Sequence, residues 1–467
     1  MTAPLQPGTA ATPRVLIGAP ASNAGKTTVT CALLRALQQR GHRPLACKCG
    51  PDYIDPMFHA RVTGVASRNL DLFLASAHLA RQTLARASAN SSVTVLEGAM
   101  GYYDGIAMGA DASAWDVART TQTPALLVVD ARGRALSLAA EVAGFMRFRE
   151  PSMIAGIILN RASAGMLDRL ASSVEAELGV PVLGGLPALP DCSFESRHLG
   201  LVSAGEIADL QHKLNQLASA TEEYIDIDGL LRIATAAPAL PLPEPKAKPA
   251  GQPVCIAIAR DEAFSFYYDD TLDALEDAGA QLVPFSPLRD AQLPRGACGL
   301  YLGGGYPELH ARALSNNAPM RASIRAALAN GMPLIAECGG FLYLHSLLTT
   351  EDGAGFPLVG GIDAKAFPTG KLGRFGYVTL HAHNDSLLCE AGDTLRAHEF
   401  HYWDSTNPGS SFTAVKPQST RSWECCHSSA TMYAGFPHLY LAASPKATQR
   451  FVDACRAYGR ASVPEGW

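Results

Sequence analysis

Short apolar runs alternate with segments of helical periodicity through both halves of the chain. In the first half, the runs typical of buried strands are Val15–Ile17, Val93–Leu96, Ala125–Val129 and Ile154–Leu159. In the second half, they are Val254–Ala259, Leu282–Pro284, Gly299–Leu302 and Pro333–Ala336. After the first run, apolar residues recur at helical spacing, at Val29, Leu33, Leu34 and Leu37. Because continuous apolar runs indicate strands covered on both faces, the pattern predicts α/β domains with parallel sheets flanked by helices.

A proline-rich stretch, Ala236–Pro253, separates the two halves. It carries six prolines and has no apolar periodicity. Proline removes backbone donors and favours extended chain, so we expect this stretch to tether the halves without packing on either. The predicted organisation is a first domain at residues 1–235, a linker at 236–253 and a second domain at 254–467.

Composition and charge narrow the class of protein. The 467 residues are 48% hydrophobic and 17% charged, which fits globular domains. The net charge of −5 gives no electrostatic footprint for nucleic acid, and no apolar run of about 18 residues predicts a membrane span. The first residues lack the basic start and apolar core of a signal peptide, so we expect the eleven cysteines to be reduced thiols of a cytoplasmic protein.

Two local cysteine clusters are candidate metal ligands. One is Cys47 with Cys49, and the other is Cys425 and Cys426 with His427. Neither cluster has a second pair of ligands at the spacing that a zinc site needs. We therefore expect these residues to be ordinary core or surface cysteines.

A glycine-lysine-threonine segment follows the first predicted strand and opens the first helix. Its residues are Ser22, Asn23, Ala24, Gly25, Lys26, Thr27 and Thr28. This strand-to-helix context is the one that a phosphate-binding loop requires. Lys26 can bring a positive charge to the β and γ phosphates of ATP, and the Thr27 hydroxyl can bind Mg²⁺. The spacing departs from the usual motif, because Pro20 stands where the first glycine is expected.

Two further loops that follow predicted strands carry carboxylates. Lys48–Pro56 follows a short predicted strand at Pro44–Cys47 and contains Asp52 and Asp55. Glu97–Gly105 follows the strand that ends at Leu96 and begins with a glutamate. In open α/β sheets, ligands bind beyond the carboxyl ends of the strands, where the phosphate loop also points. These carboxylates are therefore candidates to hold Mg²⁺ or to orient a substrate. Arg197–Leu201 is a fourth candidate loop.

The second half carries the pattern of a thiol nucleophile. A strand runs into consecutive glycines at Gly303–Pro307, which would let backbone N–H groups approach a substrate oxygen. Cys338 lies between a predicted buried strand and a predicted helix, as at a nucleophile elbow, and a helix N-terminus lowers the pKa of a thiol. A general base should activate the thiol, and the candidates are His398, His401 and His438.

These motifs together resemble the cobyrinate a,c-diamide synthases, the glutamine-dependent ATP amidoligases of cobalamin biosynthesis. The motifs that carry the resemblance are Ser22–Thr28, Lys48–His59, Asn69–Asp71, Glu97–Gly105, Arg197–Leu201, Gly303–Glu308, Ala336–Leu344, His398–Tyr402 and Ala434–Tyr440. The first half is similar to dethiobiotin-synthetase-like ATPases, whose phosphate loop also departs from the usual glycine spacing. This similarity implies a doubly wound parallel sheet. The second half is similar to class I glutamine amidotransferases of the cobyrinate and cobyric acid type.

The resemblance implies roles for residues of the second half. Cys338 matches the nucleophile that forms a glutamyl thioester, and His438 matches the histidine that activates it. Gly304 and Gly305 match the oxyanion region. Most class I amidotransferases carry a glutamate two residues after the histidine, but here that position is Tyr440. The group that orients His438 is therefore unassigned.

The resemblance also implies roles in the first half. These are phosphate binding by Lys26 and Thr27, metal binding by Thr27, Asp52 and Glu97, and substrate binding or activation by Tyr53, Asp55 and Asp104. The implied reaction is amidation of the a and c carboxylates of cobyrinic acid through acyl phosphates. It uses ATP, Mg²⁺ and ammonia released from glutamine.

Other functions stay open at the level of sequence. Cobyric acid synthase has the same parts but amidates other side chains, and the Gly50–Pro56 and His398–Tyr402 segments argue against it. The sequence alone barely separates this chain from a nickel-sirohydrochlorin a,c-diamide synthase. From a different class, the chain could be a nucleotide-switched ATPase, or a binding module with an inactive amidotransferase half. Retention of Cys338 and His438 argues against the binding module. The expected partners are small molecules, and a homodimer is left open.

Overall fold

The computed structural model describes residues 8–189, 192, 204–242 and 252–462. The chain forms two compact units, Met1–Pro245 and Lys246–Trp467. Each unit has its own sheets and its own hydrophobic cores. Every helix in the described ranges is too short or too polar to cross a membrane.

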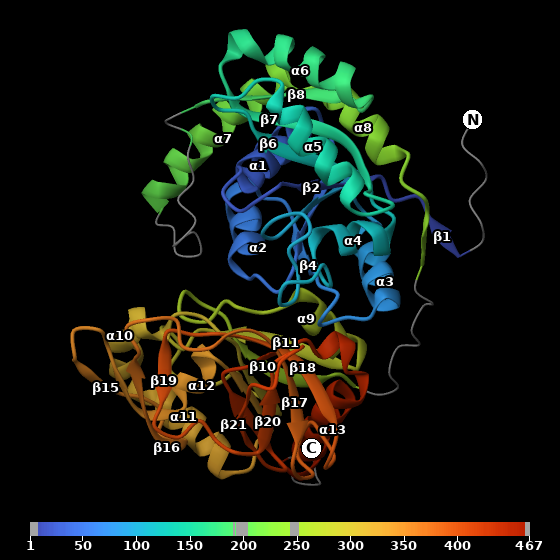
Figure 1. The fold of residues 1–467 in the computed structure, drawn as a ribbon. Coiled ribbons are helices and arrows are strands. Elements are labelled where there is room, and N and C mark those ends of the chain that lie inside the picture. The colour runs from blue at the N-terminus through green and yellow to red at the C-terminus, as the bar shows by residue number, and fades with distance from the viewer. Residues whose placement is uncertain (1–7, 190–191, 193–203, 243–251, 463–467) are drawn as a thin grey trace. The chain divides into compact units, whose positions relative to one another are not determined.

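A seven-stranded sheet forms the centre of the first unit (Figure 1). Its strands are β2 (Arg14–Gly18), β3 (Pro44–Cys49), β4 (Ser67–Leu70), β5 (Val93–Glu97), β6 (Ala125–Asp130), β7 (Ile154–Ala162) and β8 (Val182–Pro187). They lie in the order β4-β3-β5-β2-β6-β7-β8, and each neighbouring pair is parallel. Strands lie on both sides of β2, so the doubly wound parallel sheet expected from the sequence is confirmed.

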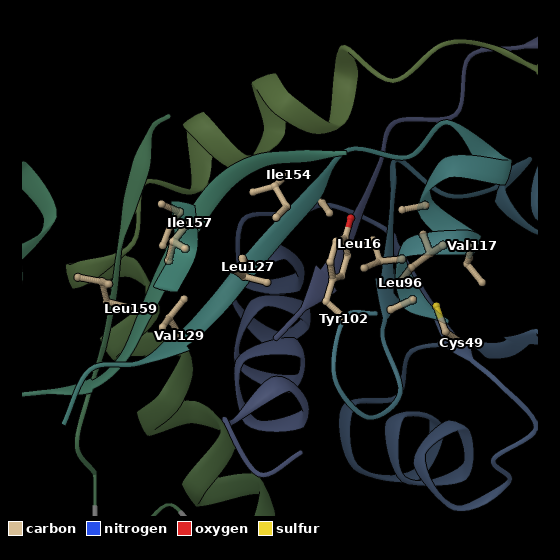
Figure 2. Packing of buried hydrophobic residues seen from close by; sticks show 14 of the residues in the cluster. Leu16, Cys49, Leu96, Tyr102, Val117, Leu127, Val129, Ile154, Ile157 and Leu159 are labelled. Atoms are coloured by element: carbon tan, nitrogen blue, oxygen red, sulfur yellow. The ribbon is translucent and has the colours of Figure 1, made fainter. Parts of the chain in front are cut away.

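Alternating side chains place a hydrophobic core on each face of this sheet. The helices on one face are α1 (Lys26–Gln39), α7 (Ala204–Tyr224) and α8 (Ile227–Thr235), and those on the other are α3 (Ala77–Ser88), α4 (Ala114–Thr121), α5 (Ser137–Phe148) and α6 (Ala164–Leu178). On β2, Val15 and Ile17 pack in the first core and Leu16 packs in the second. Figure 2 shows Leu16, Leu127 and Leu159 in that second core.

The start of the proline-rich stretch packs on the first unit, so the expectation of a free tether is wrong there. β9 (Leu240–Pro241) pairs antiparallel with β1 (Thr9–Ala10). Leu240 is buried in the core of the first unit. Its apolar side chain gains more from burial than the short segment gains from staying extended in water. Residues 243–251 lie outside the described part of the chain.

A six-stranded sheet forms the centre of the second unit. Its strands are β10 (Val254–Ala259), β11 (Ala280–Phe285), β12 (Gly299–Leu302), β13 (Leu334–Glu337), β22 (His427–Ser428) and β23 (Met432–Gly435). Their order is β11-β10-β12-β13-β23-β22, and only the last pair is antiparallel. The helices of this unit are α9 (Asp269–Asp277), α10 (Ala311–Asn316), α11 (Ala318–Ala329), α12 (Gly339–Tyr343) and α13 (Pro445–Ser462).

Two further sheets of the second unit were not expected from the sequence. A five-stranded antiparallel sheet has the order β21 (Ser422–Cys425), β20 (Phe412–Val415), β17 (Phe375–Ala382), β18 (Thr394–Phe400) and β24 (His438–Leu439). A four-stranded sheet has the order β15 (Gly355–Pro357), β14 (His345–Thr349), β16 (Ile362–Pro368) and β19 (Trp403–Ser405). Continuous apolar runs do not reveal strands such as β16 and β17, which bury alternate residues. In β17, Val378 and Leu380 are buried while His381 is exposed.

The structure describes all eleven cysteines, and each is a free thiol. Cys47 and Cys49 lie in a core of the first unit, and Cys425 and Cys426 lie in a core of the second. These four residues are core cysteines, as expected. Within the described ranges, no group of three or more His, Cys, Asp and Glu side chains is arranged to hold a metal ion by itself.

Candidate active sites

The loop between β2 and α1 is held in a left-handed backbone shape. The φ angle is 63° at Asn23 and 102° at Gly25. A Cβ atom at Gly25 would lie 2.0 Å from Nδ2 of Asn160, so only glycine fits. The Asn160 amide donates to the carbonyl oxygen of Ala24 at 2.8 Å. The loop is thus fixed on β7, while Ser22 stays exposed.

Lys26, the first residue of α1, turns its ammonium back over this loop. Its Nζ donates to the carbonyl oxygens of Ala21 at 3.1 Å and Met100 at 2.5 Å. Burial, with the nearby charge of Lys48, lowers the pKa of Lys26 to about 8. Thr28 follows in the first turn and is half-buried. An anionic phosphate at this point would favour the charged form of the lysine.

Glu97 is the centre of a buried charge network. Its Oε1 accepts from the Thr27 hydroxyl at 2.7 Å and from Nζ of Lys48 at 2.8 Å. Its Oε2 lies 3.0 Å from Nε2 of His59, and Lys48 also pairs with Asp55. Burial, the largest single effect, would raise the pKa of Glu97, but Lys48 and His59 together outweigh it and hold that pKa below its usual range. Glu97 therefore stays ionised although it is fully buried.

Asp52 and Tyr53 lie next to this network, before α2 (Ile54–Phe58). Oδ1 of Asp52 accepts from the N–H of Ile54 at 2.8 Å, and the Asn69 amide donates to the Asp52 carbonyl oxygen at 2.6 Å. Burial and the neighbouring Asp55 raise the pKa of Asp52 to about 6. A cation bound here would lower that pKa again.

Asp104 closes its own loop after β5. Its Oδ2 accepts from the N–H of Gly101 at 3.0 Å. A Cβ atom at Gly101 would lie 2.7 Å from the backbone oxygen of Pro20, so glycine fits this turn best. Asp104 also acts on Lys26, whose pKa its charge raises against the larger effect of burial. The structure thus brings the acidic loop to the phosphate loop.

Three residues of this region received no role from the sequence. Two of them, Lys48 and His59, lie in the Lys48–His59 motif. Lys48 contacts Glu97 because the two residues stand opposite each other in the pairing of β3 with β5. Asn160 has no local signal, because its contact with the loop depends on β7, far along the chain. Arg197–Leu201, the fourth candidate loop, lies outside the described residues.

In the second unit, Cys338 occupies a sharp turn between β13 and α12. Its backbone angles are φ 48° and ψ −102°, a conformation that costs free energy for a residue with a Cβ atom. Its N–H donates to the carbonyl oxygen of Gly435 at 2.8 Å, and its thiol lies 3.7 Å from the carbonyl oxygen of Phe400. The strand-to-helix elbow predicted around the cysteine is present.

The glycine-rich strand end packs directly against this turn. A Cβ atom at Gly304 would lie 2.4 Å from Cε1 of His438. A Cβ atom at Gly339, the residue after Cys338, would lie 2.9 Å from the backbone nitrogen of Gly305. The missing side chains therefore let the glycine backbone approach both the nucleophile turn and the histidine.

His438 is the candidate base that the structure brings to this turn. It is buried in β24, and its Nδ1 lies 3.9 Å from Oε2 of Glu337. Burial, with His398 and His401 nearby, lowers the pKa of His438 to about 3. The imidazole is therefore neutral at neutral pH, which is the form that accepts a proton.

The other two candidate histidines have different surroundings. His398 of β18 stands opposite His438 in the β18–β24 register. His401 places Nδ1 2.6 Å from the carbonyl oxygen of Trp403, and its ring stacks on Phe436 with centroids 3.8 Å apart. His438 is the histidine whose ring lies against Gly304. His398 and His401 lie near His438 and add to the effect of burial in lowering its pKa.

The pKa of the Cys338 thiol differs from the expectation. Burial raises the pKa of Cys338 well above its usual range, and the charge of Glu308 adds to this effect. The predicted lowering by a helix N-terminus is outweighed, because α12 has only five residues and the sulfur is shielded from water. Transfer of the thiol proton to a base must therefore accompany attack.

Comparison with known proteins agrees with both halves. Residues 15–201 match the CobQ/CobB/MinD/ParA nucleotide binding domain. Residues 255–445 match the CobB/CobQ-like glutamine amidotransferase domain. The structural units therefore correspond to a nucleotide-binding and an amidotransferase domain, as the sequence motifs indicated.

Curated relatives match almost end to end. The cobyrinate a,c-diamide synthase of Caldanaerobacter subterraneus subsp. tengcongensis is 36% identical over 94% of this chain and 97% of its own length. That of Gloeobacter violaceus is 39% identical over 95% and 97%, and that of Listeria monocytogenes serotype 4b is 38% identical over 91% and 96%. The chain belongs to the cobyrinate a,c-diamide synthase family. Membership of this family confirms the resemblance on which the residue roles rest.

Proposed function

We propose that this protein amidates the a and c carboxylates of cobyrinic acid, using ATP and ammonia released from glutamine. The supporting observation is that one chain joins a lysine-threonine phosphate loop to a cysteine on a nucleophile turn. Relatives that bear the name cobyrinate a,c-diamide synthase span both parts. Ammonia made in one unit and an activated carboxylate made in the other would give an amide.

The first unit would activate the carboxylate. A carboxylate is a poor electrophile, and transfer of the γ-phosphate of ATP converts it to an acyl phosphate that ammonia can attack with loss of phosphate. Lys26 would hold the γ-phosphate and balance its charge. Tyr53 directly precedes α2, Asp55 lies in its first turn and Asp104 lies in the loop after β5. The charges of Asp55 and Asp104 act on Lys26, and these three residues would bind or orient the corrinoid side chain.

The donor set of this region fits a magnesium ion. Thr27, Asp52 and Glu97 offer the hard oxygen atoms that Mg²⁺ prefers, and Mg²⁺ commonly takes one or two carboxylates with phosphate oxygens and water. When bound, Mg²⁺ would neutralise charge on the phosphates. Lys48 holds Glu97 and Asp55 in place with a positive charge that does not depend on a metal.

The second unit would release ammonia. Sγ of Cys338 attacks the side-chain amide carbon of glutamine while the thiol proton passes to His438. Backbone N–H groups of the Gly304–Gly305 region would face the oxyanion of the tetrahedral intermediate. The C–N bond then breaks, His438 returns the proton to the leaving ammonia, and water cleaves the thioester to glutamate.

Mass spectrometry of the product tests the proposal. Purified protein would receive ATP, Mg²⁺ and glutamine with cobyrinic acid, and separately with nickel sirohydrochlorin. A diamide from cobyrinic acid is expected. A diamide from the nickel substrate alone would keep the mechanism but assign the enzyme to the other tetrapyrrole. No amide from either would overturn the substrate class, even if glutamine were hydrolysed.

A further inference from the structure

The carboxyl of Glu337 bridges the nucleophile strand and the histidine strand. Glu337 ends β13 directly before Cys338 and is 1% exposed. Its Oε1 accepts from the N–H of Leu439, the residue after His438, at 2.9 Å. Its Oε2 accepts from the Tyr301 hydroxyl at 3.0 Å and lies 3.9 Å from Nδ1 of His438. One side chain therefore contacts the backbone and faces the ring of the same β24 strand.

Position 440, where most class I amidotransferases carry the glutamate that orients the histidine, holds a tyrosine in this chain. Tyr440 occupies it, and its hydroxyl donates to Oδ2 of Asp270 in α9 at 2.7 Å. Both side chains are buried, so Tyr440 ties β24 to that helix.

Both members of the catalytic pair are neutral at rest. Burial raises the pKa of the Cys338 thiol and lowers that of His438 to about 3. Such a pair needs a group that fixes the tautomer with Nδ1 protonated and that stabilises the imidazolium once Nε2 has taken the thiol proton. Among the ion pairs of the described residues, Glu337 supplies the carboxyl within 4 Å of the His438 ring, whereas Glu399 faces His401 at 3.8 Å.

We propose that Glu337 is the positioning residue of His438, replacing the glutamate that is absent at position 440. The proposal rests on the glutamine hydrolysis proposed above. Glu337 forms and breaks no covalent bond. Its carboxyl faces Nδ1 at 3.9 Å, and Tyr301 and Leu439 hold that carboxyl in place. Closure of this separation to hydrogen-bond length when glutamine binds would orient the imidazole with Nε2 toward the thiol.

The test compares Glu337→Gln with Glu390→Gln, which makes the same change on an exposed glutamate. Burial raises the pKa of the Glu337 carboxyl to about 8, so both variants are assayed at about pH 9, where the carboxyl is ionised. Glu337→Gln keeps the shape of the side chain and an acceptor for Leu439, but it cannot carry that charge. Its kcat for glutamine hydrolysis should fall about 10- to 100-fold, with the KM for glutamine within about twofold of the parent. Glu390→Gln should match the parent in both constants.

Alkylation of Cys338 gives a readout that a purely structural role would not move. Iodoacetamide modification, followed by peptide mass spectrometry without ATP or corrinoid, should slow at Cys338 in Glu337→Gln. It should not slow at the partly exposed Cys298, which serves as the internal reference. Tyr301→Phe frees one carboxyl oxygen and should give a smaller loss of kcat, about two- to tenfold.

The outcomes separate the two proposals. If folded Glu337→Gln hydrolyses glutamine at the parent rate and alkylates normally, the positioning role is wrong. If that variant does not fold, Tyr301→Phe decides, and an unchanged kcat and alkylation rate in it overturns the role. If the parent protein hydrolyses no glutamine, the proposed function fails, whatever the variants do.

Discussion

The missing side chain of Gly304 lets His438 lie against the glycine-rich strand end, which packs on the nucleophile turn. Substitution by alanine would place a Cβ atom 2.4 Å from Cε1 of His438 and 3.2 Å from Cβ of Phe266. Because His438 is buried, its ring would have to leave its present position to make room for that atom. In the proposed mechanism, the geometry around this glycine would therefore affect proton transfer from Cys338 to His438.

We expect Gly304→Ala to lose glutamine hydrolysis by at least about 100-fold, the usual worth of a positioned base. Gly355→Ala is the matched control, because the nearest atom to its Cβ would lie at an ordinary 3.5 Å. Steady-state glutamate release measures both variants. Normal turnover by Gly304→Ala would contradict the placement of His438 as the base.

Glu337 also predicts how stability varies with pH. Burial raises the pKa of this carboxyl to about 8, against a usual value of 4.5. The folded protein thus holds a proton that the unfolded chain has lost. The resulting stabilisation is complete below pH 4.5 and is lost as pH rises through about 8. Glu337→Gln cannot ionise, so its free energy of unfolding relative to the parent should increase between about pH 6 and pH 9. Urea unfolding at both pH values checks this, and a constant difference would contradict it.

How far residues could be assigned from sequence depended on distance along the chain. Cys338 and the Ser22–Thr28 loop could be assigned from the local sequence, because a predicted strand precedes each of them and a predicted helix follows. Glu337 could not be singled out, because its partner Leu439 lies 102 residues away. Asn160 was missed for the same reason, as it reaches Ala24 across 136 residues.

At the scale of elements, the pairing of β3 with β5 builds the charge network. Lys48 stands opposite Glu97 in this register, and both side chains are buried. Removing the ammonium would leave the Glu97 and Asp55 carboxylates without their cation. We expect Lys48→Met to destabilise the first unit by about 3–5 kcal/mol, the usual cost of an unpaired buried charge.

Denaturant unfolding checks this expectation. The double variant Lys48→Met, Glu97→Gln should recover much of the loss, because it removes a buried charge as well. Lys446→Met, at an exposed pair with Glu390, should leave stability almost unchanged. Equal effects of the two lysine substitutions would show that the network does not stabilise the fold.

Elements were predictable where they are apolar throughout. The strands β2, β5, β6 and β7 are nearly continuous runs of buried aliphatic residues. β4 was missed because it is short and polar, and its Asn69 is buried through hydrogen bonds to the carbonyl oxygens of Gly50 and Asp52. Such a strand is stabilised by partners that pattern alone does not reveal.

At the scale of the whole molecule, the two chemistries should separate by mutation. Cys338→Ala should reduce glutamine-driven amidation to about 1% or less while ammonia-driven amidation continues. Lys26→Ala should remove both, because each needs an activated carboxylate. Product formation with glutamine or with ammonium salts measures this. Loss of both activities in folded Cys338→Ala, or ammonia-driven synthesis by Lys26→Ala, would contradict the division of labour.

The pairing of Thr9–Ala10 with Leu240–Pro241 has a consequence for how such proteins can be rearranged. It places the first and the last strand of the first unit next to each other. A module with adjoining ends can be cut out, inserted into another chain or circularly permuted without reordering its strands. We therefore expect the nucleotide-binding unit to tolerate transfer into another chain through this two-residue strand pair.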